Sequence, residues 1–131
     1  MTHNLSLFGI CSITACVGLS EIARASNGDT ILVSAAAGAT GSAVCQIAMI
    51  KGLKVIGLTS QDEKCDYLQS LGVEAINYKK VVNLHDAIME KTTGQGIDIY
   101  WDSAGGEILD IAIATCKKYA RIVVCGRMSF F

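Results

Sequence analysis

A turn of very small residues at positions 36–41 is the part of this chain whose residue types point most directly to chemistry. A short apolar stretch at 31–34 precedes it. Gly38 and Gly41 stand where the dinucleotide-binding fingerprint G-x-G-x-x-G has its second and third glycines, with Ala36 in place of the first. Small side chains let the backbone approach a pyrophosphate, and the N-terminus of a helix starting near Gly41 favours an anion. The pattern predicts the start of a dinucleotide-binding unit.

A second polar turn is predicted to lie beside the first one. Residues 102–106 read Asp-Ser-Ala-Gly-Gly and directly follow an apolar stretch at 97–101. If the strands before the two turns are neighbours in a parallel sheet, both turns lie at its carboxyl edge, where open α/β folds bind ligands. On residue types alone, Ser103 could equally be the N-cap of the next helix. The segment is therefore either half of a ligand site or a helix start.

The end of the second predicted strand bears on the choice of nucleotide. An NAD-binding unit normally has Asp or Glu there, about 20 residues after the glycine turn, to hold the ribose hydroxyls. This chain has Leu-Thr-Ser at 58–60, and Asp62 and Glu63 come later, where the first turn of a helix favours acids anyway. The missing acid, the hydroxyl of Ser60 and the charge of Lys64 favour a 2′-phosphate, and therefore NADP. NAD stays the alternative, because a helical lysine is commonly just solvated.

Strands and helices are predicted to alternate along the chain, and this alternation positions the two turns. Apolar patterns predict strands at 31–34, 54–58, 75–77, 97–101 and 120–125, and helices at 41–51, 62–71, 84–92 and 105–117. Alternation of this kind implies parallel pairing with right-handed crossovers. We expect an α/β, Rossmann-type doubly wound sheet of order 3-2-1-4-5, with the ligand crevice between strands 1 and 4.

The composition, net charge and cysteine spacing of the chain argue against several classes of partner. The 131 residues suit one domain, and 51% of them are hydrophobic, which fits a sheet covered on both faces. The net charge of −1 gives no electrostatic reason to expect nucleic acid or an acidic membrane as partner. The six cysteines have neither zinc-site spacing nor a disulfide pattern, so we expect no metal, free thiols and a reducing, cytoplasmic location.

The leading residues are predicted to pack on the domain as a helix over 7–25. The apolar run at 5–19 resembles a secretion signal, but no Lys or Arg precedes it and it is too short to span a bilayer. We therefore divide the chain into a leading helical segment, 1–25, and a dinucleotide-binding domain, 26–131.

Taken together, these segments resemble the cofactor domain of zinc-independent medium-chain reductases. The resemblance is to the prostaglandin reductase, or alkenal/one oxidoreductase, branch of this quinone oxidoreductase-like family. Matching segments lie at 31–51, 57–71, 77–79, 102–109 and 121–129. Residues 9–19 resemble the segment just before this domain, so the resemblance covers almost the whole chain. The resemblance implies NADPH binding in a Rossmann fold. It also implies an oxidoreductase that reduces the C=C bond of α,β-unsaturated ketones and aldehydes by hydride transfer.

The resemblance also implies the contacts of the cofactor. It places the pyrophosphate on Gly38, Ala39, Thr40 and Gly41. It places the 2′-phosphate near Lys64 and Tyr78, beside Ser60. Ser103 stands where the family usually has asparagine, and Cys125, Gly126 and Arg127 fall on the nicotinamide side. No side chain is a good candidate for the proton donor, so we nominate no catalytic residue.

Members of this family are much longer than this chain, with parts of a substrate domain before and after the matching region. We therefore expect the substrate domain and the last strand of the sheet to be absent, and the enone to bind only in the full-length enzyme. The isolated domain should bind cofactor with little turnover. The alternative is a catalytically silent NADPH-binding or interaction module, such as a truncated paralogue. The bare edge of strand 5 could pair with a second copy in a homodimer.

Overall fold

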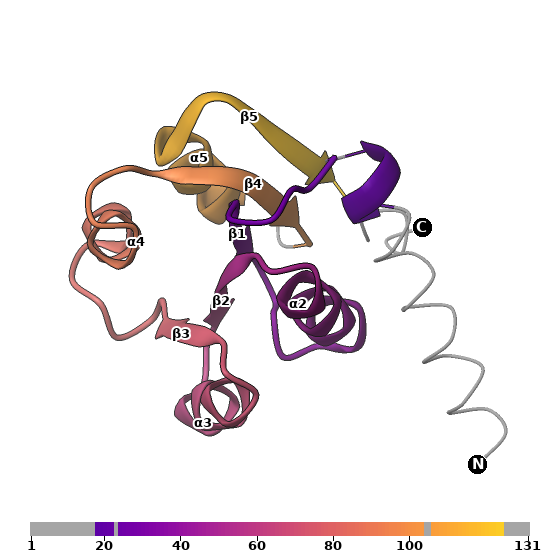
Figure 1. Cartoon of the computed structure of the whole chain (residues 1–131). Coiled ribbons are helices and arrows are strands. Elements are labelled where there is room, and N and C mark those ends of the chain that lie inside the picture. Colours follow the sequence, from indigo (N-terminus) through magenta and orange to yellow (C-terminus); the bar gives the residue numbers. More distant parts are fainter. Residues whose placement is uncertain (1–17, 23, 104–105, 125–131) are drawn as a thin grey trace, which may run out of the picture.

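The computed structural model describes residues 18–22, 24–103 and 106–124. They form a five-stranded parallel sheet flanked by helices (Figure 1). The strand order is β3-β2-β1-β4-β5, so the expected Rossmann-type order is confirmed. None of the helices in the described ranges is long and apolar enough to cross a membrane. The elements are η1 (Gly18–Ile22), β1 (Thr30–Val33), α2 (Ala39–Ile50), β2 (Lys54–Thr59), α3 (Asp62–Ser70), β3 (Glu74–Asn77), α4 (Leu84–Lys91), β4 (Ile97–Asp102), α5 (Gly106–Ala114) and β5 (Cys116–Val124).

Buried side chains cover both faces of the sheet, because successive residues of a strand point to opposite sides. On one face, Val33 and Trp101 belong to a core that includes residues of α2 and α3. On the other face, Leu32 and Tyr100 belong to a core that includes residues of α4 and α5. Figure 1 shows the two pairs of helices on opposite sides of the sheet. Because helices cover both faces, the connecting turns at the carboxyl edge of the sheet are the parts available to form a ligand site.

The leading segment is anchored to the sheet through η1. Leu19 is fully buried in the same core as Trp101. Gly18 lies against the indole, since a Cβ there would fall 2.4 Å from two ring carbons of Trp101. Most of the helix predicted over 7–25 lies outside the described residues. Its described part is a five-residue π-helix that ends at Ile22, so the predicted end is wrong; Arg24, at φ 50, has left the helical conformation.

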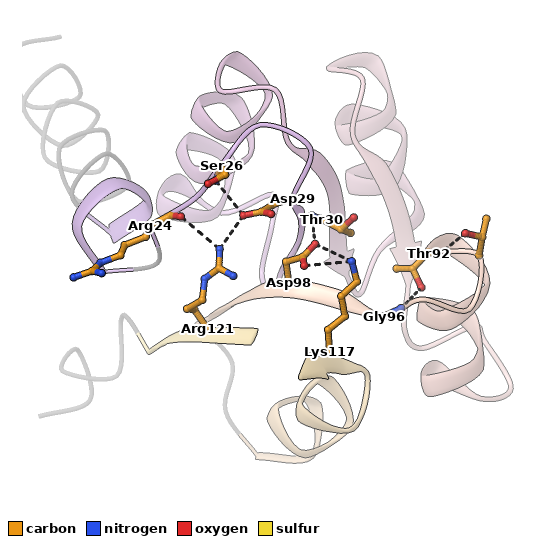
Figure 2. A network of polar contacts seen from close by, with 10 residues as sticks. Arg24, Ser26, Asp29, Thr30, Thr92, Gly96, Asp98, Lys117 and Arg121 are labelled. Atoms are coloured by element: carbon orange, nitrogen blue, oxygen red, sulfur yellow. Dashed lines mark hydrogen bonds and ion pairs between the residues drawn. The ribbon is translucent and has the colours of Figure 1, made fainter. Parts of the chain in front are cut away.

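Ion pairs join the amino end of the sheet to β5 (Figure 2). The Arg121 guanidinium donates to the Asp29 carboxylate at 2.8 Å. Lys117 Nζ lies 3.3 Å from the Asp98 carboxylate, which also accepts the Thr30 N–H at 2.8 Å. The segment before β1 is therefore held to β4 and β5 at the end of the sheet opposite the glycine turn.

The helix predicted over 105–117 is wrong in its last residues. Helix α5 ends at Ala114, and Cys116 already pairs with Ile97 at the start of β5. The cause is a tertiary contact, because the Ile97 N–H donates to the Thr115 carbonyl at 3.0 Å. The register then shifts before Ile99 pairs with Arg121, so β5 is longer and less regular than the predicted strand.

Candidate functional site

The small-residue turn between β1 and α2 forms the base of the candidate site. Helix α2 begins at Ala39, slightly earlier than the predicted start near Gly41. Gly41 is buried under the turn: a Cβ there would lie 2.3 Å from the Ala35 carbonyl oxygen and 2.9 Å from Ala36 Cα. Both are backbone atoms that cannot move aside as a side chain could. Only glycine therefore allows the helix to start this close to the strand.

The N-terminus of α2 carries no side-chain cap. Its N-cap residue is Gly38, which has no side chain to bond the first N–H groups, and the first turn contains no acidic residue. The helix is 12 residues long, so its first backbone N–H groups and the positive end of its dipole lie at this point. Such an N-terminus fits an anion, and a phosphate group is the common occupant.

A pocket of about 190 Å³ opens beside this turn. Its walls come from the glycine turn, from the end of β2 with the start of α3, from the segment after β3, and from α5. It therefore collects four of the predicted cofactor residues (Gly38, Ser60, Lys64 and Tyr78) from three separate segments. The full lining is Ala35, Ala37, Gly38, Thr59, Ser60, Lys64, Tyr78 and Ile108.

Backbone hydrogen bonds fix the walls of this pocket relative to one another. The Ala36 N–H donates to the Leu58 carbonyl at 3.0 Å, which ties the glycine turn to β2. The Tyr78 N–H donates to the Thr59 carbonyl at 3.0 Å, which ties the segment after β3 to β2. The pocket walls that carry Gly38, Ser60 and Tyr78 thus follow the carboxyl ends of three neighbouring strands.

No acidic residue lines this pocket. Asp62 and Glu63 occupy the first turn of α3, as expected. The Asp62 carboxylate accepts hydrogen bonds from the Lys80 ammonium and, at 2.9 Å, from the Asn77 amide. These donors, Lys80 foremost, lower the pKa of Asp62, and Asp62 in turn raises the pKa of Lys80. Asp62, two residues from both Ser60 and Lys64, is therefore already paired, and Lys64 is the charged group in the lining.

A buried polar cluster lies where β1 and β4 end. The Ser34 hydroxyl donates to the Trp101 carbonyl at 3.2 Å and accepts the Ser103 N–H at 2.7 Å. The Tyr100 hydroxyl donates to the Asp102 carboxylate at 3.0 Å, and both residues are buried. Burial is the main cause that raises the pKa of Tyr100 far above its ordinary value. This cluster lies at the reversal of strand order.

Sequence reasoning missed the roles of Ser34 and Tyr100. The sequence patterns place Ser34 at the end of one predicted strand and Tyr100 within another, and give neither a role at the site. Their one available signal was position, because both stand beside the predicted switch in strand order.

Three of the predicted nicotinamide contacts, Cys125, Gly126 and Arg127, lie outside the described residues. Ser103 is half-buried beside Ser34 and does not line the pocket. Ala39, Thr40 and Gly41 form the first turn of α2. Within the described ranges, no group of three or more His, Cys, Asp or Glu residues could hold a metal ion.

Comparison with known sequences identifies relatives of this chain. Residues 39–129 match the family described as zinc-binding dehydrogenase. Prostaglandin reductase 1 from Oryctolagus cuniculus is 44% identical over 128 residues, which are 97% of this chain and 36% of that protein. The 2-alkenal reductase (NADP(+)-dependent) from Nicotiana tabacum is 38% identical over 131 residues, 98% of this chain and 38% of that protein. This chain thus spans less than two-fifths of either relative.

A solved structure shares the fold. CurA from Vibrio vulnificus, crystallised in complex with NADPH, superposes with a TM-score of 0.78 and 38% identity, covering 86% of this chain and 33% of CurA. The cofactor in that complex matches the class of ligand expected from the glycine turn. The family description also names zinc. The described residues offer no group of ligands that would fit a zinc ion.

Proposed function

This chain belongs to the zinc-binding dehydrogenase family, and from that premise we propose that it is the NADPH-binding domain of an oxidoreductase. One observation carries the proposal: the pocket beside the glycine turn is lined by Lys64, Ser60 and Tyr78 and by no acid. A cation with two hydroxyl groups suits the 2′-phosphate that distinguishes NADPH from NADH. The relatives named above include an NADP-dependent reductase, which supports the same cofactor.

Each part of the cofactor has a proposed position on the chain. The pyrophosphate lies over the uncapped start of α2, on the backbone of Gly38, Ala39, Thr40 and Gly41. This start fits because Gly38 has no side chain that could cap the helix and Gly41 keeps the turn close to the helix. Lys64 pairs with the 2′-phosphate, and Ile108 supplies apolar lining for the adenosine half.

The nicotinamide half is proposed to lie toward the end of β4. Ser103 stands there beside the buried Ser34 cluster, and Cys125, Gly126 and Arg127 are proposed as further contacts. When bound, NADPH supplies the hydride, and the protein's part is to bind and orient it. Ser34 fixes where the segment after β4 begins, so its role is to position that half of the site. We assign no proton donor to this chain.

For the whole enzyme, we propose reduction of the C=C bond of α,β-unsaturated ketones or aldehydes. The names of the relatives, prostaglandin reductase 1 and 2-alkenal reductase, support this substrate class. We propose that residues 26–131 are the cofactor domain, that residues 1–25 pack against it, and that the substrate domain belongs to the rest of a full-length enzyme. The isolated chain should then bind NADPH and turn over little enone.

A second candidate function is a catalytically silent module that associates through β5. This strand is at the edge of the described sheet, and the side chains of Tyr119 and Ile122 are 82% and 38% exposed. A strand at the edge of a sheet can pair with another chain, which supports a homodimer. Light scattering over a range of concentrations tests it: a dimer is expected, and a monomer throughout counts against edge pairing.

We place the protein in the cytoplasm. The thiols of Cys45, Cys65 and Cys116 are free, as suits a reducing compartment.

Calorimetric titration of the 131-residue chain with NADPH and, separately, NADH tests the cofactor assignment. NADPH should bind at least about tenfold more tightly, since hydrogen bonds to a charged group contribute about 1.5–3 kcal/mol. The fragments 2′,5′-ADP and 5′-AMP should show the same preference, because they differ in the 2′-phosphate alone. Equal binding of the two fragments, or preference for NADH, would exclude the Lys64 pocket as a phosphate site.

A further inference from the structure

We propose that Asp62, which does not line the candidate cofactor pocket, favours 2′-phosphorylated nucleotides by clamping the segment after β3 to the start of α3. This makes Asp62 a positioning residue for Lys64 and Tyr78. The inference deepens the proposed function and rests on it. It starts from a feature that NADPH binding alone does not explain: an acid just after β2 that is turned toward another loop.

The clamp has two bonds and reaches the backbone. Asn77 Nδ2 donates to Asp62 Oδ1 at 2.9 Å, while Asn77 Oδ1 accepts the Lys79 N–H at 3.1 Å. Lys80 adds a charge-assisted bond to the other oxygen of Asp62. Through Asn77, the carboxylate is therefore connected to the backbone on the C-terminal side of Tyr78.

The two segments that the clamp joins each contribute a residue to the pocket lining. Lys64 lies two residues after Asp62 in α3, and Tyr78 lies directly after Asn77. Both Lys64 and Tyr78 line the pocket, whereas Asp62 and Asn77 do not. The clamp thus sets how far the Lys64 ammonium lies from the Tyr78 hydroxyl, which is the spacing a phosphate between them would need.

The clamp and simple electrostatics predict opposite effects on NADPH binding when the charge of Asp62 is removed. A free carboxylate beside the pocket would repel a 2′-phosphate and accept hydrogen bonds from ribose hydroxyls, as the acid of NAD-binding domains does. Pairing with Lys80 satisfies that carboxylate. Electrostatics alone predicts that removing the negative charge of Asp62 tightens NADPH binding, whereas the clamp predicts that it weakens binding.

The test compares Asp62→Asn with Glu63→Gln in the 131-residue chain. Both changes remove one negative charge from the first turn of α3, but Glu63 does not line the pocket and is not a partner of Asp62. In calorimetric titrations, Asp62→Asn should weaken NADPH binding about fivefold, the equivalent of one hydrogen bond, and leave NADH unchanged. Glu63→Gln should leave both unchanged, and Asp62→Glu, which keeps the charge, should recover much of the loss.

A structural role alone would not give this result. The Asp62 and Lys80 side chains are 57% and 66% exposed, and exposed pairs contribute little to global stability. Melting temperatures of the variants should therefore stay close to that of the parent chain while the NADPH-to-NADH ratio changes. Asn77→Ala breaks the bond from Asn77 to the Asp62 carboxylate without changing any charge and should also lower the ratio, so the test stands even if Asp62→Asn folds poorly.

The outcomes separate the clamp from the proposed function. If the parent chain prefers NADPH but Asp62→Asn matches Glu63→Gln, or binds NADPH more tightly, the clamp is wrong and the cofactor assignment stands. If the parent chain shows no preference for NADPH, both the clamp and the cofactor assignment are wrong.

The double variant Asp62→Asn/Lys80→Met tests whether the two residues act as one unit, as proposed. In that case it should bind NADPH no more weakly than either single variant. Additive losses of affinity would contradict the clamp.

Discussion

Ser34 and Ser103 are 69 positions apart in the chain, yet the Ser34 hydroxyl accepts the Ser103 N–H at 2.7 Å. The same hydroxyl donates to the Trp101 carbonyl at 3.2 Å, and Ser34 is fully buried. One side chain therefore joins the end of β1 to the end of β4 at the reversal of strand order. The two turns that sequence analysis predicted to meet are held together by this residue.

Ser34→Ala should lower the free energy of unfolding by about 1–3 kcal/mol, because the Ser103 N–H and the Trp101 carbonyl lose a buried partner. Urea titration followed by the fluorescence of the buried Trp101 measures the change. Ser42→Ala is the matched control: its hydroxyl contacts Tyr67 and Gln46 on the outside of α2, and its loss should stay within about 0.5 kcal/mol. Equal losses in the two variants would contradict the role of Ser34.

The two glycines of the turn should respond differently to alanine. A Cβ at Gly41 would meet backbone atoms at 2.3 and 2.9 Å, so Gly41→Ala should destabilise the fold by about 1–3 kcal/mol. A Cβ at Gly38 would come no closer than 3.3 Å to its neighbours, so Gly38→Ala should fold and lose cofactor affinity instead. Thermal melts and NADPH titrations of both variants check this contrast. Similar melting temperatures for the two would show that the Gly41 contact relaxes easily.

Lys64→Ala should weaken NADPH binding at least about tenfold, because the 2′-phosphate loses a charge-assisted hydrogen bond. NADH, which lacks that phosphate, should bind as before. Lys118→Ala removes the same charge from β5, where the ammonium lies over the Tyr119 ring, and should change neither affinity. A parallel loss for NADH would mean that Lys64 supports the fold of the pocket instead of contacting the phosphate.

The strand order and the glycine turn could be predicted because both depend on local patterns. Alternating apolar strands and helices allow few parallel arrangements, and Gly38 and Gly41 have a fixed spacing between a strand and a helix. The end of α5 could not be predicted this way, since Thr115 leaves the helix to accept a hydrogen bond from Ile97, a tertiary contact with no local signal.

The candidate site was predictable in its residue types but not in the direction of its side chains. The sequence places Asp62 two residues from Lys64, yet the carboxylate bonds to Asn77 and Lys80 while Lys64 lines the pocket. Neither spacing nor helical periodicity distinguishes these two directions. Ser34 was missed for a related reason, because its two partners come from the end of β4, far along the chain.

The thiol of Cys45 should be inert at neutral pH. Cys45 belongs to α2 and is fully buried in the core, and this burial raises its pKa to about 12. The thiol form is therefore favoured by folding: its contribution to stability is complete below the unfolded pKa of 9.0 and is lost as the pH rises toward 12. Site-resolved mass spectrometry after alkylation at pH 8 should find Cys45 unmodified in the folded chain and modified in urea.

The same shift gives an alkaline signature. Between pH 10 and 11.5, the free energy of unfolding should fall by about 1 kcal/mol per pH unit through Cys45. Cys45→Ala should be less stable at pH 7, because it leaves a cavity, and should decline less steeply above pH 9. Parallel declines in the two chains would show that other groups cause the alkaline loss.

Arg121 should contribute more to stability than an ordinary surface charge. Its guanidinium meets the Asp29 carboxylate at 2.8 Å, with both side chains about one-third exposed or less, and joins β5 to the segment before β1 (Figure 2). Arg121→Met keeps much of the apolar stem but leaves Asp29 without this partner, so we expect a loss of about 1–2 kcal/mol, between the values for exposed and buried pairs. Urea unfolding of the two chains measures it.

Glu74→Gln is the control for this pair. Glu74 lies 3.9 Å from Lys54 with both side chains 44% exposed, so its loss should stay below about 0.5 kcal/mol. A double-mutant cycle with Asp29→Asn and Arg121→Met then isolates the pair itself, and a coupling energy near zero would contradict the prediction. A clear coupling would show that the edge strand of the sheet depends on a contact with residues that precede the first strand, at the end of the fold opposite the candidate cofactor pocket.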